Sequence, residues 1–529
     1  MTYCDLIFLG IFLPVTILLY NVIPQKHRAK VLLIASYVFF WSISGKLIVF
    51  LLATTVLMYI FGICNKKLID KRKNELKNVE KNNKKIIKER YLRKTRLILV
   101  FNVVILLGMI VVLKYSTFIG NNINYLFNVI GYPVNIGIAH FAVPIGISFY
   151  TLQAISYMMD VYKEKIEPDK NIGRLALFIS FFPQIMEGPI CRYNDTAIQL
   201  WKGDKTSYKS LTFGMQRIGF GLMKKMIIAD RLDILVSGIF SNYNDYNGGI
   251  IAIGMILYTL QLYMDFSGVM DIVIGIAEIF NVKMPENFKQ PFFSKSISEF
   301  WTRWHITLGT WFRDYIYYPV CMSKKSKKMT TNLRKKFGKY YGPLIVSSVA
   351  LFCVWICNGI WHGSAWNYIF FGMYHFTLIL MGRFVEPISK KFYKKIKIRE
   401  ESVGLLLFRI VRTTILVFFG ELFFRAEGLL AGFKMFAKIF SNFTLDSLFN
   451  GEILKIGLNW QDFVIVAIFT VIFLVISIRK EQGNKVREKI AERNIVFRWT
   501  CYFAIIFAVI VFGAYGEGYV PVDPMYAQF

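Results

Sequence analysis

Two of the chain's five histidines lie in segments that could do chemistry: His305 in "EFWTRWHITLGTWFRDY" and His362 in "GIWHGSAWN". Tryptophans flank both, in otherwise apolar surroundings. A neutral imidazole can accept a proton near pH 7, so a buried histidine held beside a hydroxyl group can act as a general base. The segment around His305 alone would favour a satisfied interfacial histidine with no catalytic role. Two such segments in one chain favour catalysis.

The segment around His305 is too polar to span a membrane and too aromatic to lie in water, which is typical of helices in the interface or in a buried cavity. We expect a helix over Ser296–Tyr317. On such a helix Trp301 and His305 share a face, and Glu299 and Arg303 form an (i, i+4) ion pair.

The composition indicates an integral membrane protein. Of the 529 residues, 55% are hydrophobic, and the mean hydropathy is +0.45. About 20 helical residues cross the hydrocarbon core of a bilayer. The shorter or Gly- and Pro-broken apolar runs are expected to be buried or re-entrant helices. The apolar runs are Leu6–Ile23, Val31–Ile43, Leu47–Ile63, Leu97–Leu113, Ile138–Met158, Leu175–Met186, Leu211–Phe240, Ile250–Phe280, Leu344–Ile360, Tyr368–Met381, Leu405–Phe424, Phe463–Ile478 and Trp499–Ala514.

The net charge of +30 resides in loops between the apolar runs, which argues against nucleic-acid binding and fits the positive-inside rule. Both termini are then expected outside the cytoplasm, and the first apolar run is expected to be a retained anchor. Richness in Lys, Ile and Asn is typical of an AT-rich bacterial genome, so the bacterial cell membrane is the expected location. The basic segments are Lys26–Lys30, Lys66–Arg96, Lys324–Lys339, Lys390–Arg399 and Arg479–Arg498.

The same rule places His362 at the far end of a helical hairpin. The segments Lys324–Lys339 and Lys390–Arg399 are both assigned to the cytoplasm, so the chain between them enters the membrane and returns, with its turn at Trp361–Asn367. An ionisable residue within the membrane is a functional candidate. The seven cysteines form no CxxC pair and no metal site is expected, although Cys353, Cys357 and His362 would be the candidate ligands.

Five segments of the sequence are informative when they are taken together: "PQIMEGPICRY", "YMDFSGVMDIVIGIAEIFNVKMPENFKQPF", "SISEFWTRWHITLGTWFRDYIYYP", "GIWHGSAWNYIFFGMYH" and "FFRAE". They resemble the membrane-bound O-acyltransferase superfamily, in particular its bacterial branch of alginate and other polysaccharide O-acetyltransferases, to which the teichoic-acid D-alanyl transferase is related. The resemblance implies an all-α polytopic fold, a ring of tilted helices with re-entrant or interfacial helices around a central tunnel. It also implies one membrane domain over residues 1–529, with an extracytoplasmic tail at 515–529.

The resemblance assigns the essential catalytic histidine to His362 and the family's second motif position to His305. Trp304 and Trp361 are expected to bind substrate. Glu187 and Arg192 would pair with each other or meet the donor's phosphates. Asp265, Ser267 and Asp271 would line the tunnel or, with somewhat more support, form a structural network.

By the same resemblance, a cytoplasmic thioester, acetyl-CoA or an acyl carrier protein, donates an acyl group across the membrane, and no bound cofactor is expected. His362 would act as general base, and His305 would orient the thioester or stabilise the oxyanion. Tyr526 in the tail "DPMYAQF" would relay the acyl group, or the tail would be a plain disordered terminus.

The expected acceptor is an extracellular or cell-wall polysaccharide, reached through an extracytoplasmic SGNH-type acetyltransferase. Acetyl transfer is preferred over D-alanyl transfer to teichoic acid. A transporter or flippase of an acylated carrier is the alternative outside enzymes. Such proteins show inverted repeats, and no corresponding halves are visible in the sequence.

Overall fold

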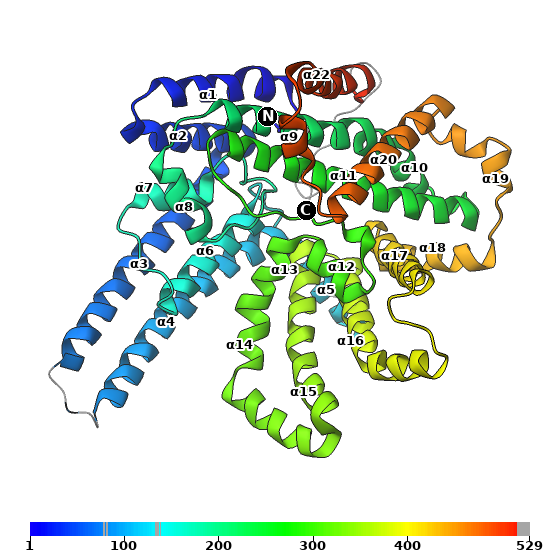
Figure 1. Cartoon of the computed structure of the whole chain (residues 1–529). Helices are drawn as coiled ribbons and strands as arrows, with labels where there is room; N and C mark the ends of the chain where they lie inside the picture. The colour runs from blue at the N-terminus through cyan, green and yellow to red at the C-terminus, as the bar shows by residue number, and fades with distance from the viewer. Residues whose placement is uncertain (78–79, 81–82, 133–136, 138, 516–529) are drawn as a thin grey trace. The chain divides into compact units, whose positions relative to one another are not determined.

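The chain is built from helices, and the residues described form no strand. The structure is a computed structural model that describes residues 1–77, 80, 83–132, 137 and 139–515 (Figure 1). Two compact units divide the chain: the first holds residues 1–215 and 273–285, and the second holds 216–272 and 286–529. The all-α prediction is confirmed. The prediction of one membrane domain over residues 1–529 stays a prediction, and the predicted tail, apart from Tyr515, lies outside the described residues.

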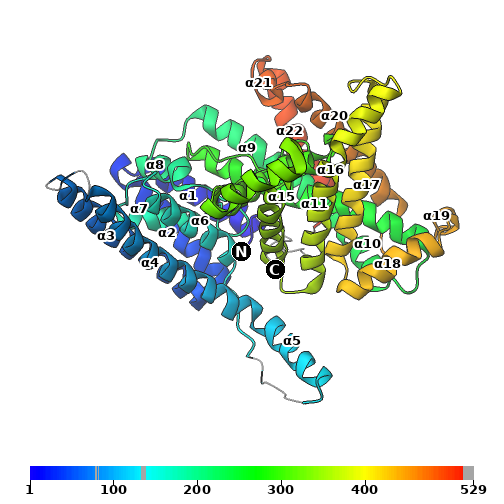
Figure 2. The same ribbon diagram turned by 90° about the horizontal axis from the view of Figure 1, so that it is seen from below.

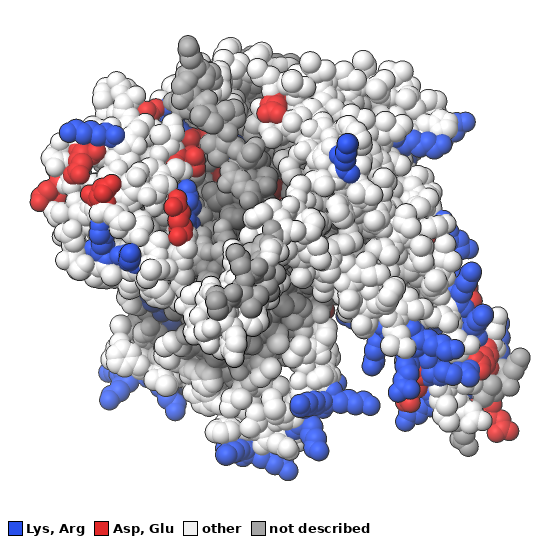
Figure 3. All heavy atoms as spheres, turned by 180° about the vertical axis from the view of Figure 1, so that it is seen from behind, with Lys and Arg blue, Asp and Glu red and all other residues white. Residues whose placement is uncertain are grey.

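A long helical hairpin is the most extended feature of the first unit. Its arms α3 and α4 run antiparallel (Figure 1), and ionic side chains gather at its tip (Figure 3), within the basic segment Lys66–Arg96. Helix α5 continues from the end of α4 away from the other helices of this unit (Figure 2). The helices are α1 Leu13–Val22, α2 Gln25–Ser44, α3 Ile48–Lys77, α4 Lys84–Ile110, α5 Ser116–Val129, α6 Ile147–Tyr162, α7 Ile172–Ser180 and α8 Tyr193–Lys202, with α9, Tyr208–Leu222, ending in the second unit.

The second unit carries both candidate histidines. Helix α15 changes direction at Gly338, whose φ of +79° suits a residue without a Cβ, so the basic segment before it is separated from the apolar segment after it. The helices are α10 Asp230–Ser241, α11 Gly248–Ile279, α12 Ile297–Arg303, α13 Ile306–Phe312, α14 Tyr318–Cys321, α15 Lys324–His362, α16 Trp366–Lys395, α17 Val403–Arg425, α18 Leu429–Ser441, α19 Asp446–Phe449, α20 Trp460–Glu481, α21 Val486–Ala491 and α22 Ile495–Phe512. The end of α11, from Val273 on, belongs to the first unit. The π-helix η4, Met223–Ala229, links α9 to α10.

Within the described residues, eight helical stretches are long and apolar enough to cross a membrane, so the chain is a multi-pass membrane protein. Some predicted apolar runs form shorter helices, as expected. The run Leu175–Met186, for example, contributes only the end of α7, which stops at Ser180. The eight stretches are Gln25–Lys77, Lys84–Val129, Gly248–Ile279, Lys324–His362, Trp366–Lys395, Val403–Arg425, Trp460–Glu481 and Ile495–Phe512.

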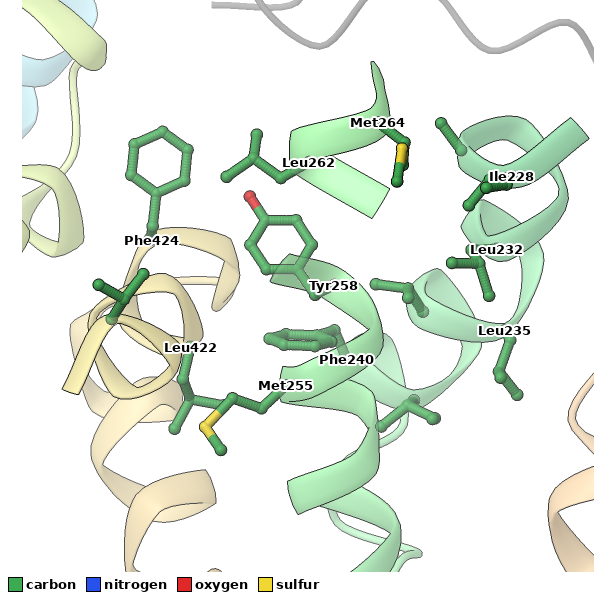
Figure 4. Close-up of a cluster of buried hydrophobic side chains, with 14 of the residues drawn as sticks. Ile228, Leu232, Leu235, Phe240, Met255, Tyr258, Leu262, Met264, Leu422 and Phe424 are labelled. Carbon is green, nitrogen blue, oxygen red and sulfur yellow. The ribbon is translucent and has the colours of Figure 1, made fainter. Parts of the chain in front are cut away.

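An apolar core joins α10, α11 and α17 in the second unit (Figure 4). Leu422 and Phe424 of α17 face the α11 residues Met255, Tyr258 and Leu262 in this view. Because lipid is as apolar as these side chains, their van der Waals packing, and not removal from water, stabilises the contact between the helices. The core therefore fixes the end of α17 that borders the histidine site described below.

Close packing of α15 on α16 depends on two glycines. A Cβ on Gly372 would lie 2.5 Å from the backbone oxygen of Trp355, and one on Gly359 would lie 2.6 Å from that of Tyr368. Neither backbone oxygen can move without displacing its helix. The hairpin that carries His362 thus requires both glycines.

We expect Gly372→Ala to lower the free energy of unfolding by about 1–3 kcal/mol, because the added methyl group overpacks the hairpin. Gly382, on the same helix, has no heavy atom within 4 Å of a built Cβ. The matched Gly382→Ala variant should therefore unfold at an unchanged or slightly higher temperature. Thermal unfolding in detergent measures both, and equal melting temperatures for the two variants would contradict this account of the hairpin.

Candidate active site

The backbone breaks its helix at His305, so the predicted single helix over Ser296–Tyr317 is wrong. Helix α12 ends at Arg303, and α13 begins at Ile306. Between them Trp304 is extended, and His305 is left-handed with φ +44° and ψ +51°. The predicted ion pair is confirmed within α12, since Arg303 Nη2 lies 2.8 Å from Glu299 Oε1.

Asn287 holds this break in place. Its side-chain Oδ1 accepts hydrogen bonds from the backbone nitrogen and the hydroxyl of Thr307, both at 3.0 Å. Its backbone oxygen accepts from the nitrogen of Ile306 at 3.0 Å. These bonds satisfy the backbone N–H groups of Ile306 and Thr307, two of the N–H groups that have no partner inside the helix at its start. A left-handed non-glycine residue costs about 1–3 kcal/mol, and such residues cluster at functional sites.

The ring of His305 is buried, with 2% of the residue exposed. Its Nδ1 lies 3.4 Å from Oδ1 of Asn287, an atom that can only accept. The proton of the neutral ring therefore sits on Nδ1, and Nε2 carries the lone pair. Burial lowers the pKa of His305 to about 3, so the ring is neutral near pH 7.

This burial predicts a pH dependence of stability. An unfolded imidazole has a pKa near 6.5, so below that pH the unfolded chain binds a proton that the folded site does not. The stability contributed by neutral His305 is fully present above pH 6.5 and is lost as the pH falls from 6.5 toward 3. Between pH 7.5 and 5.5, we expect the free energy of unfolding of the wild type to fall by about 1 kcal/mol more than that of His305→Asn. Melting temperatures across this range test it, with His140→Asn, at an exposed histidine, as the control.

His362 is the last residue of α15, and the chain turns at Gly363 before α16 begins at Trp366. The predicted hairpin turn at Trp361–Asn367 is confirmed. The residue is 3% exposed, and its ring centroid lies 5.1 Å from that of Phe424 and 5.9 Å from that of Phe371. The imidazole is thus enclosed by aromatic rings from α16 and α17.

The indole of Trp361 brings the two histidines together. Its centroid lies 5.6 Å from the ring of His305 and 5.1 Å from that of His362. The "FFRAE" segment joins the same site, because Asn367 Nδ2 donates to the backbone oxygens of Phe424 and Ala426, both at 3.2 Å. Segments far apart in the sequence therefore converge on one pair of imidazoles.

The contacts of three other predicted site residues are as follows. Trp304 stacks on Phe300, with centroids 5.4 Å apart, within an aromatic cluster of the second unit. Glu187, which is buried, and Arg192, whose backbone nitrogen donates to Asp195 Oδ2 at 3.2 Å, belong to the first unit. Their roles in substrate binding stay predictions.

Each polar residue predicted on α11 meets a buried lysine, which fits the structural network better than a tunnel lining. The contacts are Lys225 Nζ to Asp265 Oδ1 at 2.9 Å, Lys224 Nζ to Ser267 Oγ at 3.2 Å, Lys224 Nζ to Asp271 Oδ2 at 2.8 Å and Arg217 Nε to Asp271 Oδ1 at 2.9 Å. Tyr526 lies outside the described residues.

Sequence reasoning missed two buried ionisable residues beside the site. His375 of α16 has no exposed surface, and Glu421 of α17 is 2% exposed. His375 lies one helical turn from Phe371, and Glu421 lies one turn from Phe424, both of which contact the ring of His362. Their occurrence inside apolar runs was the available signal, because ionisable residues within membranes are rare and functional.

Comparison with known proteins shows the family of the chain. The model of "MBOAT, membrane-bound O-acyltransferase family" matches residues 169–333, which include His305 and end before His362. The chain is 31% identical over 475 residues to "Probable alginate O-acetylase AlgI" of Azotobacter vinelandii, covering 89% of this chain and 85% of the relative.

Two further relatives are similar over shorter stretches. A "Peptidoglycan O-acetyltransferase" of Helicobacter pylori is 29% identical over 326 residues, 56% of this chain and 57% of the relative. A "Teichoic acid D-alanyltransferase" of Bacillus subtilis is 32% identical over 252 residues, 47% of this chain and 61% of the relative. The identity over most of the Azotobacter protein confirms the predicted relationship: the chain is an acyltransferase and belongs to the membrane-bound O-acyltransferase family.

Proposed function

We propose that this acyltransferase moves an acetyl group from a cytoplasmic thioester to a hydroxyl group outside the membrane, for O-acetylation of an extracellular or cell-wall polysaccharide. The observation that carries the proposal is the packing of the His305 and His362 rings against one indole, that of Trp361, in a buried site. The relatives named for O-acetylation of alginate and peptidoglycan support both the acetyl group and the polysaccharide acceptor.

In the proposed reaction, His362 takes the proton of the attacking hydroxyl group while the hydroxyl oxygen forms a bond to the thioester carbonyl carbon. The carbon–sulfur bond then breaks, the electron pair leaves on sulfur, and the proton held by His362 passes to the thiolate. With its proton on Nδ1, neutral His305 presents a lone pair at Nε2. Because this nitrogen accepts and does not donate a hydrogen bond, His305 is better suited to orienting a reactant than to stabilising an oxyanion.

The C-terminal tail would provide the first acceptor of the acyl group, outside the membrane. Tyr526 would accept the acyl group first and hold it as an ester before an extracytoplasmic SGNH-type acetyltransferase passes it to the polymer. This order requires the donor, acetyl-CoA or an acyl carrier protein, on the cytoplasmic side and both termini outside. The basic loops of the sequence support that orientation.

Purified full-length protein incubated with acetyl-CoA or with an acetylated carrier protein tests the proposal. We expect release of free thiol and a mass increase of one acetyl group that maps to Tyr526 and is lost in Tyr526→Phe. Thiol release from a D-alanyl carrier alone would support the D-alanyl reading. Movement of an acylated carrier across vesicles without thiol release would support a transporter, and either result would overturn the proposal.

A further inference from the structure

A buried arginine holds the last turn of α22 to the rest of the second unit. Arg231, near the start of α10, is 5% exposed. Its Nη2 donates to the backbone oxygen of Phe512 at 2.7 Å, and its Nη1 donates to the carboxylate of Asp462. Its Nε donates to the backbone oxygen of Ile227 at 3.3 Å. One guanidinium group thus joins η4, α20 and the end of α22.

The carboxylate of Asp462 is fixed by its own helix. Asp462 Oδ2 accepts from the backbone nitrogen of Asn459 at 3.2 Å, and the backbone nitrogen of Asp462 donates to Asn459 Oδ1 at 2.9 Å. This capping box lies at the N-terminus of α20, where a negative charge is favoured. The last carbonyl groups of a helix have no partner within it and favour a cation. The ion pair therefore aims Arg231 at such a carbonyl group, that of Phe512.

A second bond holds the chain where it leaves α22. The backbone nitrogen of Ala514 donates to the backbone oxygen of Met226 at 2.8 Å. Met226 belongs to the π-helix η4, and π-helical turns are frequent at functional sites. Gly513, between the two bonded residues, is extended, with φ −64° and ψ 144°. The C-terminal tail therefore begins from a fixed point on η4.

These two bonds define the position of the end of α22 because the other contacts of the helix are apolar. All residues of α22 are described, and none of them is buried. The ring of Phe512 lies 5.5 Å from that of Phe469, and Cγ2 of Ile505 would lie 2.6 Å from a Cβ on Gly219. Apolar contacts are not directional, so they do not fix the end of the helix as a hydrogen bond does.

The anchored end and His362 are connected through one apolar core. Ile228 of η4 and Leu232 of α10 lie on one side of α11, and Phe424, whose ring contacts that of His362, lies on the other (Figure 4). Neighbouring helices pack about 8–10 Å apart, so roughly 20 Å separates η4 from α17 across α11.

The length of the tail suits this separation. Basic segments precede both α22 and the apolar part of α15, so Phe512 and His362 are expected at the outer ends of their helices. Tyr526 follows Tyr515 by eleven residues, which span at most about 36–40 Å when extended. A tail that starts on η4 is therefore long enough to bring Tyr526 to His362.

We infer that Arg231 is a positioning residue for the acyl relay: together with Asp462 it anchors the start of the C-terminal tail and so raises the effective concentration of the Tyr526 hydroxyl group at His362. This role rests on the proposed function. A tethered acceptor reacts at an effective concentration that depends on the length and geometry of its link. The transfer step is unchanged: the acetyl carbon–sulfur bond breaks, a bond to the Tyr526 oxygen forms, and the phenol proton passes through His362 to the thiolate.

Transfer within the chain, compared with transfer to a free peptide, tests this role. Purified full-length protein is mixed with the acetyl donor that the wild type uses, and mass spectrometry follows acetylation of Tyr526 in a single turnover. We expect Arg231→Met and Ala514→Pro each to slow this acetylation about tenfold, because each removes a donor that holds the chain end. In a Tyr526→Phe background, the same two changes should leave the acetylation rate of the free peptide "VDPMYAQF", residues 522–529, unchanged.

Controls separate anchoring from folding. Arg231→Lys keeps a cation for Asp462 and should recover part of the rate. If Arg231→Met does not fold, Ala514→Pro carries the test, since it leaves the ion pair intact and follows an extended residue, as a proline requires. Val511→Ala, at a position of α22 that is 65% exposed, should keep the wild-type rate.

Each outcome has a distinct meaning. Equal slowing of the two reactions would show that Arg231 supports the whole site, and unchanged acetylation of Tyr526 in both variants would show that the tail needs no anchor. Either result would overturn the inference alone. Thiol release without acetyl on Tyr526 in the wild type would overturn the relay, and this role with it. Absence of thiol release from every acetyl donor would overturn the proposed function itself.

Discussion

Replacing His362 with alanine is expected to lower kcat/KM for thioester turnover by about a thousandfold, within the range of about 10²–10⁴ contributed by a positioned general base. The residue is buried at the hairpin turn, and its ring packs beside Trp361, Phe371 and Phe424. In the described part of the chain, no other histidine lies at the turn between α15 and α16.

Free thiol released from the acetyl donor measures this effect. His362→Gln, which keeps most of the side-chain volume, separates lost chemistry from lost packing and should be nearly as inactive. His27→Ala, on the N-terminal turn of α2, should retain wild-type turnover. Undiminished turnover in His362→Ala would remove the proposed mechanism.

Replacing Lys225 with methionine is expected to lower the free energy of unfolding by about 3–5 kcal/mol, because it leaves the buried Asp265 and the partly buried Asp230 without their cation. Lys225 is 1% exposed, and its Nζ lies 2.6 Å from Asp230 Oδ1 and 2.9 Å from Asp265 Oδ1. Burial already raises the pKa of Asp230 to about 7, while Lys225 opposes that rise. Without the lysine, the carboxyl groups must either bind a proton or stay charged in surroundings that solvate a charge poorly.

The penalty should therefore shrink as the pH falls, since protonated carboxyl groups no longer need a cation. Chemical or thermal unfolding of the variant at pH 8 and pH 5 measures this trend. Lys202 pairs with Asp204 at 2.8 Å on the surface, and its side chain is 64% exposed. The matched Lys202→Met variant should change stability by no more than about 1 kcal/mol. Similar losses in the two variants would contradict a buried network.

The sequence predicted the features that depend on local pattern. Apolar runs and basic loops gave the spanning helices and the hairpin that ends at His362. The break at His305 was not predictable in the same way, because no glycine or proline marks it. Bonds from Asn287, eighteen residues earlier, hold it, and such tertiary contacts override helix periodicity.

Burial of polar groups was harder still to foresee. His375 and Glu421 stand in runs that read as ordinary membrane helices, and only their charge type distinguishes them. Lys224 and Lys225 lie in a predicted apolar run, yet the π-helix η4 directs both toward carboxylates of α11. A period of 3.6 residues does not describe a π-helix, so helical spacing could not assign these partners.

The left-handed backbone at His305 has a consequence for selecting improved variants of this enzyme. Glycine adopts that conformation without steric cost, whereas histidine incurs about 1–3 kcal/mol. His305→Gly would therefore relax the turn and delete the imidazole in a single change. The cavity left by the buried ring opposes the gain from the relaxed backbone, so heat resistance alone does not report on this position, and stability and turnover must be measured separately.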